Sequence, residues 1–150
     1  MTITTDQLEE IMRTEIELAQ ELLVVLEEQQ EAIVHLKIGL LDELIAREHQ
    51  LLKPIQDLEK ERNKIVCHLV PQSAQKTDAA VPLRELVVYL NTEDAKRITE
   101  LGATLGEKVE TIVNFNRRLK ILLNQSLKFV RESVGILTDN YSKQLIDQKI

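Results

Sequence analysis

Few residues of this chain have side chains that bind metal ions or act as nucleophiles. The three histidines and the single cysteine are His35, His49, His68 and Cys67. They show neither the paired cysteines nor the His-x3-His spacing of zinc sites. Because neighbouring residues of a helix point about 100° apart, the adjacent Cys67 and His68 cannot easily share a metal ion or form a nucleophile and base pair. We therefore expect no metal ion and no other cofactor.

Carboxylates are plentiful, but their pattern does not indicate catalysis. Acidic pairs such as Glu9 with Glu10 and Glu27 with Glu28 lie in regions that read as solvated helix faces. A general acid needs an enclosed cleft that raises its pKa, and nothing in the sequence indicates one. Neither a Walker loop nor a GxGxxG motif is present. The sequence predicts that the protein is not an enzyme.

Composition and charge narrow the class of protein. With 4 Gly, 3 Pro, no Trp and 3% aromatic residues among 150, the chain has the profile of long packed helices. Its net charge of -6 argues against nucleic-acid binding, which depends on clustered cations. The N-terminus lacks the features of a signal peptide, and no apolar run approaches the roughly 20 residues of a membrane span. We expect a cytoplasmic protein that does not insert into membranes.

The elements that would carry a binding surface are helices, because apolar residues recur every three or four positions. Gly39 lies where this pattern loses phase and predicts a reversal or kink there, with the second helix resuming near Asp42. Pro54 predicts a kink with helix on both sides. Asn91 or Thr92 can cap the start of the last helix.

These patterns predict an all-α fold, an elongated antiparallel helical bundle or coiled coil of long helices with one short helix. We expect a single domain over residues 1–150. Its segments are an N-terminal helical pair over 4–69, a loop over 70–82, a short helix over 83–90 and a long C-terminal helix over 93–138.

The long last helix carries polar and basic residues that a simple core helix would not need. Its amides and serine, at Asn114, Asn116, Asn124, Gln125 and Ser126, fit either a wet seam or a specific contact role. Its basic residues stand without an acid between residues 111 and 131. They are Arg117, Arg118, Lys120, Lys128 and Arg131. Packing against the acidic first helix is the favoured interpretation, and an acidic partner peptide or a phosphate-bearing ligand is the alternative.

Three segments give the chain a resemblance to the FlgN-type flagellar export chaperones. They are EIELAQELLVVLEEQQEAIVHLKIG, a Leu- and Glu-rich helix ending in Gly39, then LIAREHQLLKPIQDLEKER, and finally NFNRRLKILLNQSLKFV with Tyr141 beyond it. The first two are common in coiled coils. The order of Asn, Leu-Leu, Ser-Leu and Phe between Asn116 and Val130 is more specific.

The resemblance implies a cytoplasmic type III export chaperone. Such a protein binds the C-terminal helical segments of hook-filament junction proteins, prevents their premature aggregation and delivers them to components of the flagellar export gate. The cargo would bind the C-terminal helix, whose apolar face suits groove packing. The expected partner-binding residues are Asn116, Leu119, Leu123, Ser126, Leu127, Val130, Val134, Leu137 and Tyr141.

A second function remains open at this point. The same stripes could serve only self-association, in a structural coiled-coil protein without cargo, and a homo-oligomer is compatible with either function. Within the long helix, we expect Ile98 to Ile112 to belong to the core and Asn116 to Leu137 to carry an exposed or exchangeable face.

Overall fold

The computed structural model describes residues 2–71 and 81–149, and every element in these ranges is helical. Helix α1 spans Thr2–Val34, α2 spans Ile38–Leu69, and the short α3 spans Leu83–Leu86 and continues into a 3-10 turn, η2, at Val87–Tyr89. Helix α4 spans Thr92–Lys149. The predicted all-α fold is confirmed.

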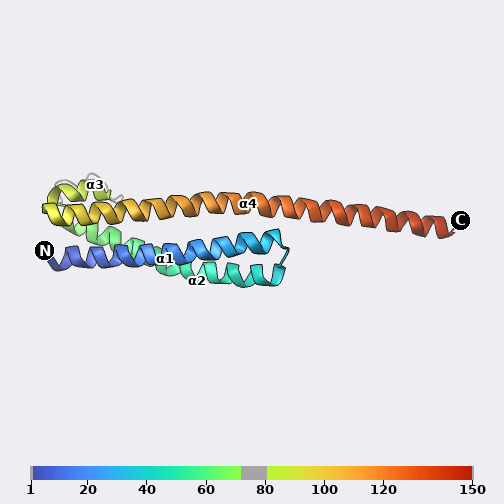
Figure 1. Cartoon of the computed structure of the whole chain (residues 1–150), viewed down its shortest axis with the longest axis horizontal. Coiled ribbons are helices and arrows are strands. Elements are labelled where there is room, and N and C mark those ends of the chain that lie inside the picture. The colour runs from blue at the N-terminus through green and yellow to red at the C-terminus, as the bar shows by residue number, and fades with distance from the viewer. Residues whose placement is uncertain (1, 72–80, 150) are drawn as a thin grey trace.

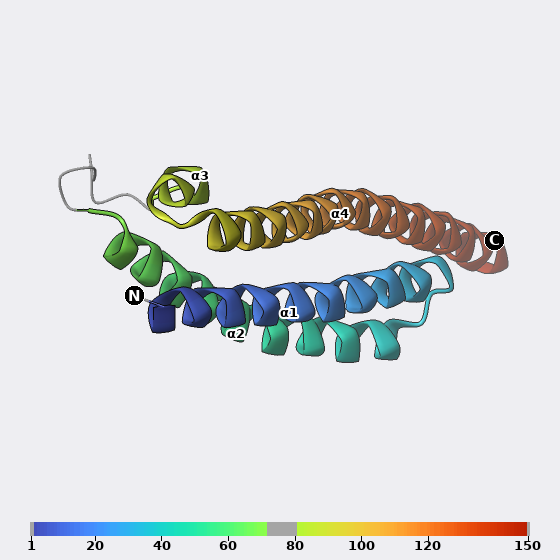
Figure 2. The same cartoon turned by 60° about the vertical axis from the view of Figure 1, so that its left-hand side comes forward.

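Helix α1 holds the bundle together. It forms an antiparallel hairpin with α2 and lies beside α4, which runs in the same direction as α1 (Figures 1 and 2). In the described ranges, α1 packs along both α2 and α4, whereas the backbones of α2 and α4 seldom come close to each other. Helix α4 continues well beyond the end of the hairpin (Figure 1). The molecule is therefore a three-helix bundle at one end and a single helix at the other.

The chain reverses between α1 and α2 at residues 35–37, so the prediction that Gly39 marks the reversal is wrong. The amide of Lys37 donates to the carbonyl of Ala32 at 2.8 Å, and the amide of Leu36 donates to that of Ile33 at 3.2 Å. These two bonds form a Schellman motif, whose left-handed position is usually a glycine. Here Leu36 occupies it, with φ of 55°. Gly39 is the second residue of α2, because the chain has already reversed at residues 35–37.

The other predicted boundaries are met to different degrees. Helix α2 continues on both sides of Pro54. Asn91 caps α4, because its side-chain oxygen accepts a hydrogen bond of 2.8 Å from the amide of Asp94. Helix α4 continues to Lys149, past the expected end at 138. Most of the loop expected over 70–82 lies outside the described residues.

The core consists of two main apolar clusters built on α1. One lies at the end of the bundle that α3 covers, and the other lies in the half nearer the reversal. The first contains Leu8, Met12, Val66, Val70, Leu86 and Ile98; the second contains Leu22, Leu26, Ile33 and Leu119. This distribution follows from the central position of α1, which supplies apolar residues toward both neighbouring helices.

Two partly buried polar contacts join α1 to α2. The Arg62 guanidinium donates to the Glu15 carboxylate at 2.9 Å, and the Gln29 amide donates to the Glu48 carboxylate at 2.8 Å. Burial raises the pKa of the Glu15 carboxyl above its ordinary value, although Arg62 opposes that shift. Because buried polar groups need partners, these contacts favour one register of the hairpin.

Candidate partner-binding surface

Apolar residues mostly three or four apart form a stripe along one face of α4, from Leu105 to Leu137, and beyond Leu119 this stripe changes from buried to exposed. Leu119 is only 6% exposed and packs with Leu22, Leu26 and Ile33. Beyond it the exposed fraction rises as α4 leaves the hairpin (Figure 1). The values are 39% for Leu123, 45% for Leu127, 47% for Val130, 55% for Val134 and 68% for Leu137. Leu119 thus belongs to the core of the free chain, and the accessible part of the predicted face begins at Leu123.

Four of the predicted residues line an apolar hollow where α4 passes the reversal of the hairpin. The four predicted residues, all from α4, are Leu123, Ser126, Leu127 and Val130. The hairpin completes the lining with Ala32, Ile33, Leu36, Ile38 and Leu41. The volume of the hollow is about 110 Å³. Small-molecule pockets usually measure roughly 300–1,000 Å³. The hollow is therefore suited to one large side chain that projects from a partner helix.

The same stripe of α4 borders a groove in the half of the bundle nearer α3. Helix α1 forms its floor, and α2 and α4 form its walls, because the backbones of these two helices seldom come close to each other. Its apolar lining includes Leu22, Leu52, Ile55, Leu105, Val109 and Ile112, and its polar end contains Glu15, Glu59 and Arg62. A Cβ added at Gly106 would meet no atom within 4 Å, so this wall of the groove is open. The three- and four-residue spacing from Leu105 to Val130 places groove and hollow on one face of α4.

The remaining predicted residues are placed as follows. Asn116 and Ser126 are half-buried, and Ser126 lines the hollow. Val134 and Leu137 are exposed and follow, along α4, the residues that line the hollow. The side chain of Tyr141 lies outside the described residues. In the other part of the helix, Ile98 and Leu105 are buried as expected, but Val109 is 48% exposed because it faces the groove.

Leu36 and Ile38 are the residues that the sequence prediction missed. Both are exposed, and both line the hollow. The available signal was the presence of two large apolar residues at a helix reversal, where glycine, asparagine and other turn residues are usual.

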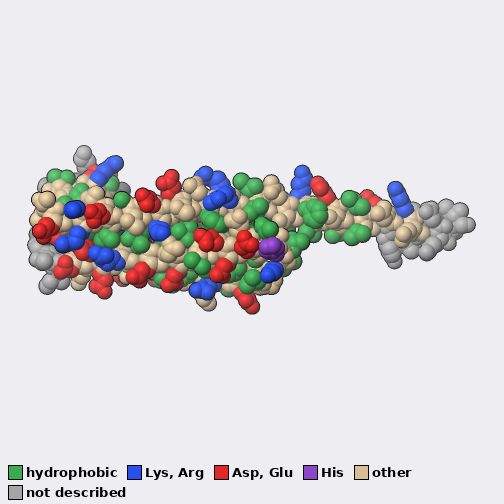
Figure 3. Space-filling view, in the orientation of Figure 1, with side chains coloured by type: hydrophobic (Ala, Val, Ile, Leu, Met, Phe, Trp, Pro, Cys, Tyr) green, Lys and Arg blue, Asp and Glu red, His purple; other side chains and the backbone are tan. Residues whose placement is uncertain are grey.

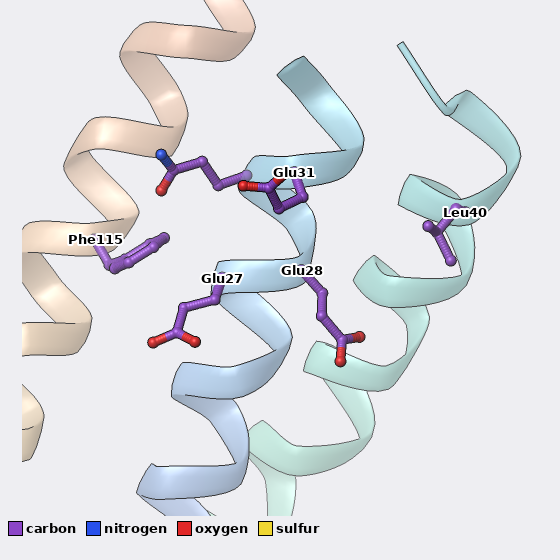
Figure 4. A pocket seen from close by; sticks show the side chains of 6 residues that line it. Glu27, Glu28, Glu31, Leu40 and Phe115 are labelled. Carbon is purple, nitrogen blue, oxygen red and sulfur yellow. The ribbon is translucent and has the colours of Figure 1, made fainter. Parts of the chain in front are cut away.

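The acidic side chains of α1 form a separate surface. Glu27, Glu28 and Glu31 project from α1 between Leu40 of α2 and Phe115 of α4 (Figure 4). All three glutamates are exposed. Phe115 is not part of the stripe that lines the hollow and the groove. The acidic surface therefore meets α4 on a different face from the stripe.

The basic cluster in the middle of α4, from Arg117 to Arg131, forms no ion pair with the described residues of the acidic first helix, contrary to the expectation. Across residues 2–71 and 81–149, the ion pair between α1 and α4 is that of Arg97 with Glu9, at 2.6 Å near the start of both helices. Arg118 stacks over the ring of Phe115, with 4.8 Å between its guanidinium carbon and the ring centroid. Lys128 lies 4.0 Å from Glu132 of its own helix. The space-filling view shows basic side chains along the middle of α4 and many acidic ones over the hairpin (Figure 3).

One comparison with known proteins identifies a family for this chain. The family model described as FlgN protein matches residues 1–145. Searches of curated proteins and of solved structures returned no match. Within the described ranges, none of the helices is both long and apolar enough to span a membrane. The match extends over nearly the whole chain, and the chain therefore belongs to the FlgN family, a family of flagellar export chaperones.

Proposed function

We propose that this protein is a cytoplasmic chaperone of flagellar type III export. It binds the C-terminal helical segments of hook-filament junction proteins along α4, prevents their premature aggregation and delivers them to the export gate. The family supports an export chaperone in general. The observation that supports this mode of binding is the apolar stripe of α4, which leaves the core after Leu119 and stays uncovered to Leu137.

The geometry suits the binding of an amphipathic helix. From Leu123 to Leu137 the stripe is about 21 Å long, at roughly 1.5 Å per residue. A cargo helix lying along it would bury its own apolar face, with one side chain in the hollow beside Leu36, as in other helix-in-groove complexes. Covering the apolar face of the cargo helix removes a surface through which the cargo would otherwise aggregate. The α1–α2 hairpin supplies the second wall of the hollow.

The second candidate is self-association without cargo. The observation that favours it is the same exposed stripe, because two copies of α4 could cover each other's Val130, Val134 and Leu137. The two functions differ in what happens on adding cargo. A cargo chaperone gives a mixed complex, whereas a purely structural coiled coil stays a tight homo-oligomer.

The test is titration calorimetry of the full chain with a peptide from the C-terminal helical segment of a hook-filament junction protein, together with analytical ultracentrifugation. The proposal requires a saturable complex with one peptide per chain. A concentration-independent homo-oligomer that ignores the peptide would refute it in favour of self-association.

A further inference from the structure

We infer that the helix bound by the α4 stripe carries acidic side chains along one flank of its apolar face, and that Lys120 and Arg131 of this chain select it. The inference rests on the proposed function, because it names the chemistry of the partner at that same surface. It distinguishes two of the basic residues of α4 from the others by their position relative to the stripe.

Lys120 and Arg131 border the stripe. Residues three or four apart are neighbours on a helix surface. Lys120 is therefore next to Leu123, while Arg131 is next to Leu127 and Val134. Their eleven-residue separation is close to three helical turns, so both lie on the same flank, about 16 Å apart.

The other basic residues lie away from the stripe. The neighbours of Lys128 at three and four residues are Asn124, Gln125, Arg131 and Glu132, none of which belongs to the stripe. Arg117 and Arg118 likewise adjoin no exposed stripe residue. Lys128 also has a carboxylate nearby, that of Glu132. The chain thus contains a matched cation on the same helix that should not contact the partner.

Lys120 and Arg131 are available to a partner. Both side chains are exposed, and within the described residues neither takes part in an ion pair, a hydrogen bond or a ring contact. The stripe between them is apolar, and Asn124 and Ser126 are its uncharged polar neighbours. A partner helix with lysines on this flank would bring like charges together, whereas one with glutamates would form two ion pairs at the rim of an apolar contact.

The experiment uses two synthetic amphipathic helices of about 21 residues with the same apolar face. One carries Glu at two flank positions eleven residues apart, and the other carries Lys at those positions. Each peptide is titrated into the full chain and into the variants Lys120→Glu/Arg131→Glu and Lys128→Glu. The titrations are repeated at roughly 0.05 and 0.5 M salt, because screening weakens exposed charge pairs. Far-UV circular dichroism verifies that each variant keeps its helix content.

We expect the unmodified chain to prefer the Glu peptide about tenfold at low salt, and to lose most of that preference at high salt. The Lys120→Glu/Arg131→Glu variant should prefer the Lys peptide, while Lys128→Glu should behave like the unmodified chain. Equal affinity for both peptides, or an effect of Lys128→Glu as large as that of the double variant, would overturn this inference and leave the proposed function standing. Binding of neither peptide, together with no binding of a cargo segment, would overturn both.

Discussion

Removing two leucines from the exposed stripe should weaken cargo binding and leave the helix intact. Leu123 and Leu127 are 39% and 45% exposed in the free chain, and both line the hollow. Full burial of a leucine contributes about 1.5–3 kcal/mol, so covering these exposed fractions contributes about 0.6–1.2 and 0.7–1.4 kcal/mol respectively. The variant Leu123→Ala/Leu127→Ala should therefore lose about 1.3–2.5 kcal/mol, or roughly 10- to 60-fold in affinity. Alanine keeps the helix because it has the highest helix propensity.

The control is a leucine-sized residue on another face of the same helix. Ile121 is 53% exposed, and its neighbours at three and four residues are Arg117, Arg118, Asn124 and Gln125, so it lies outside the stripe. Ile121→Ala should change the affinity for cargo less than twofold. Titration calorimetry measures both variants, and circular dichroism shows whether their helix content is equal. If Ile121→Ala weakened binding as much as the double variant, the stripe would not be the binding face.

Three further predictions concern the reversal, the buried ion pair and the groove. Leu36→Gly should raise the free energy of unfolding by about 1 kcal/mol, because it removes a leucine from the left-handed conformation. The same variant should weaken cargo binding, because the Leu36 side chain lines the hollow. Urea unfolding measures the stability and calorimetry the affinity, and a change of both in the same direction would refute the prediction. Arg62→Met should destabilise the chain by about 1–3 kcal/mol at pH 7, because it leaves the partly buried Glu15 carboxylate without its cation. Since burial already raises the pKa of Glu15 and the variant raises it further, the loss should shrink as the pH falls and the carboxyl becomes protonated, which thermal unfolding at several pH values checks. Gly106→Ala should raise the free energy of unfolding, measured with urea, by about 0.5–1 kcal/mol, because the new Cβ meets open space. Gly102→Ala should raise it less, because its Cβ would lie 3.1 Å from a side-chain carbon of Leu83.

The all-α fold was predictable because helical periodicity is a local property. The repeat from Ile98 to Leu137 required a long helix whichever neighbours it had, and Asn91 was a recognisable cap. The reversal was less predictable. The left-handed position of a Schellman motif is usually a glycine, but here it is Leu36. The nearest glycine, Gly39, therefore led to a wrong prediction of where the chain reverses.

The division of the α4 stripe into core and surface could not be read from its pattern. Leu119 and Leu123 occupy equivalent positions of one repeat, yet the first is buried and the second lines an open hollow. The difference arises because Leu119 packs against α1, whereas Leu123 lies beside Leu36 and Ile38, where the hairpin reverses. In the same way, the sequence showed that α4 is basic in its middle, but only the packing showed that these cations do not pair with α1.

By itself, the sequence determined that the chain forms long amphipathic helices and that one of them is longer than its partners, since both properties follow from residue spacing along a single segment. Only the tertiary structure decided which part of that helix is covered. Coverage depends on where a separate hairpin reverses and on which neighbours α1 brings together, and these are contacts between residues far apart in the sequence. The hollow beside Leu36 exists for the same reason, because no single segment contains both of its walls.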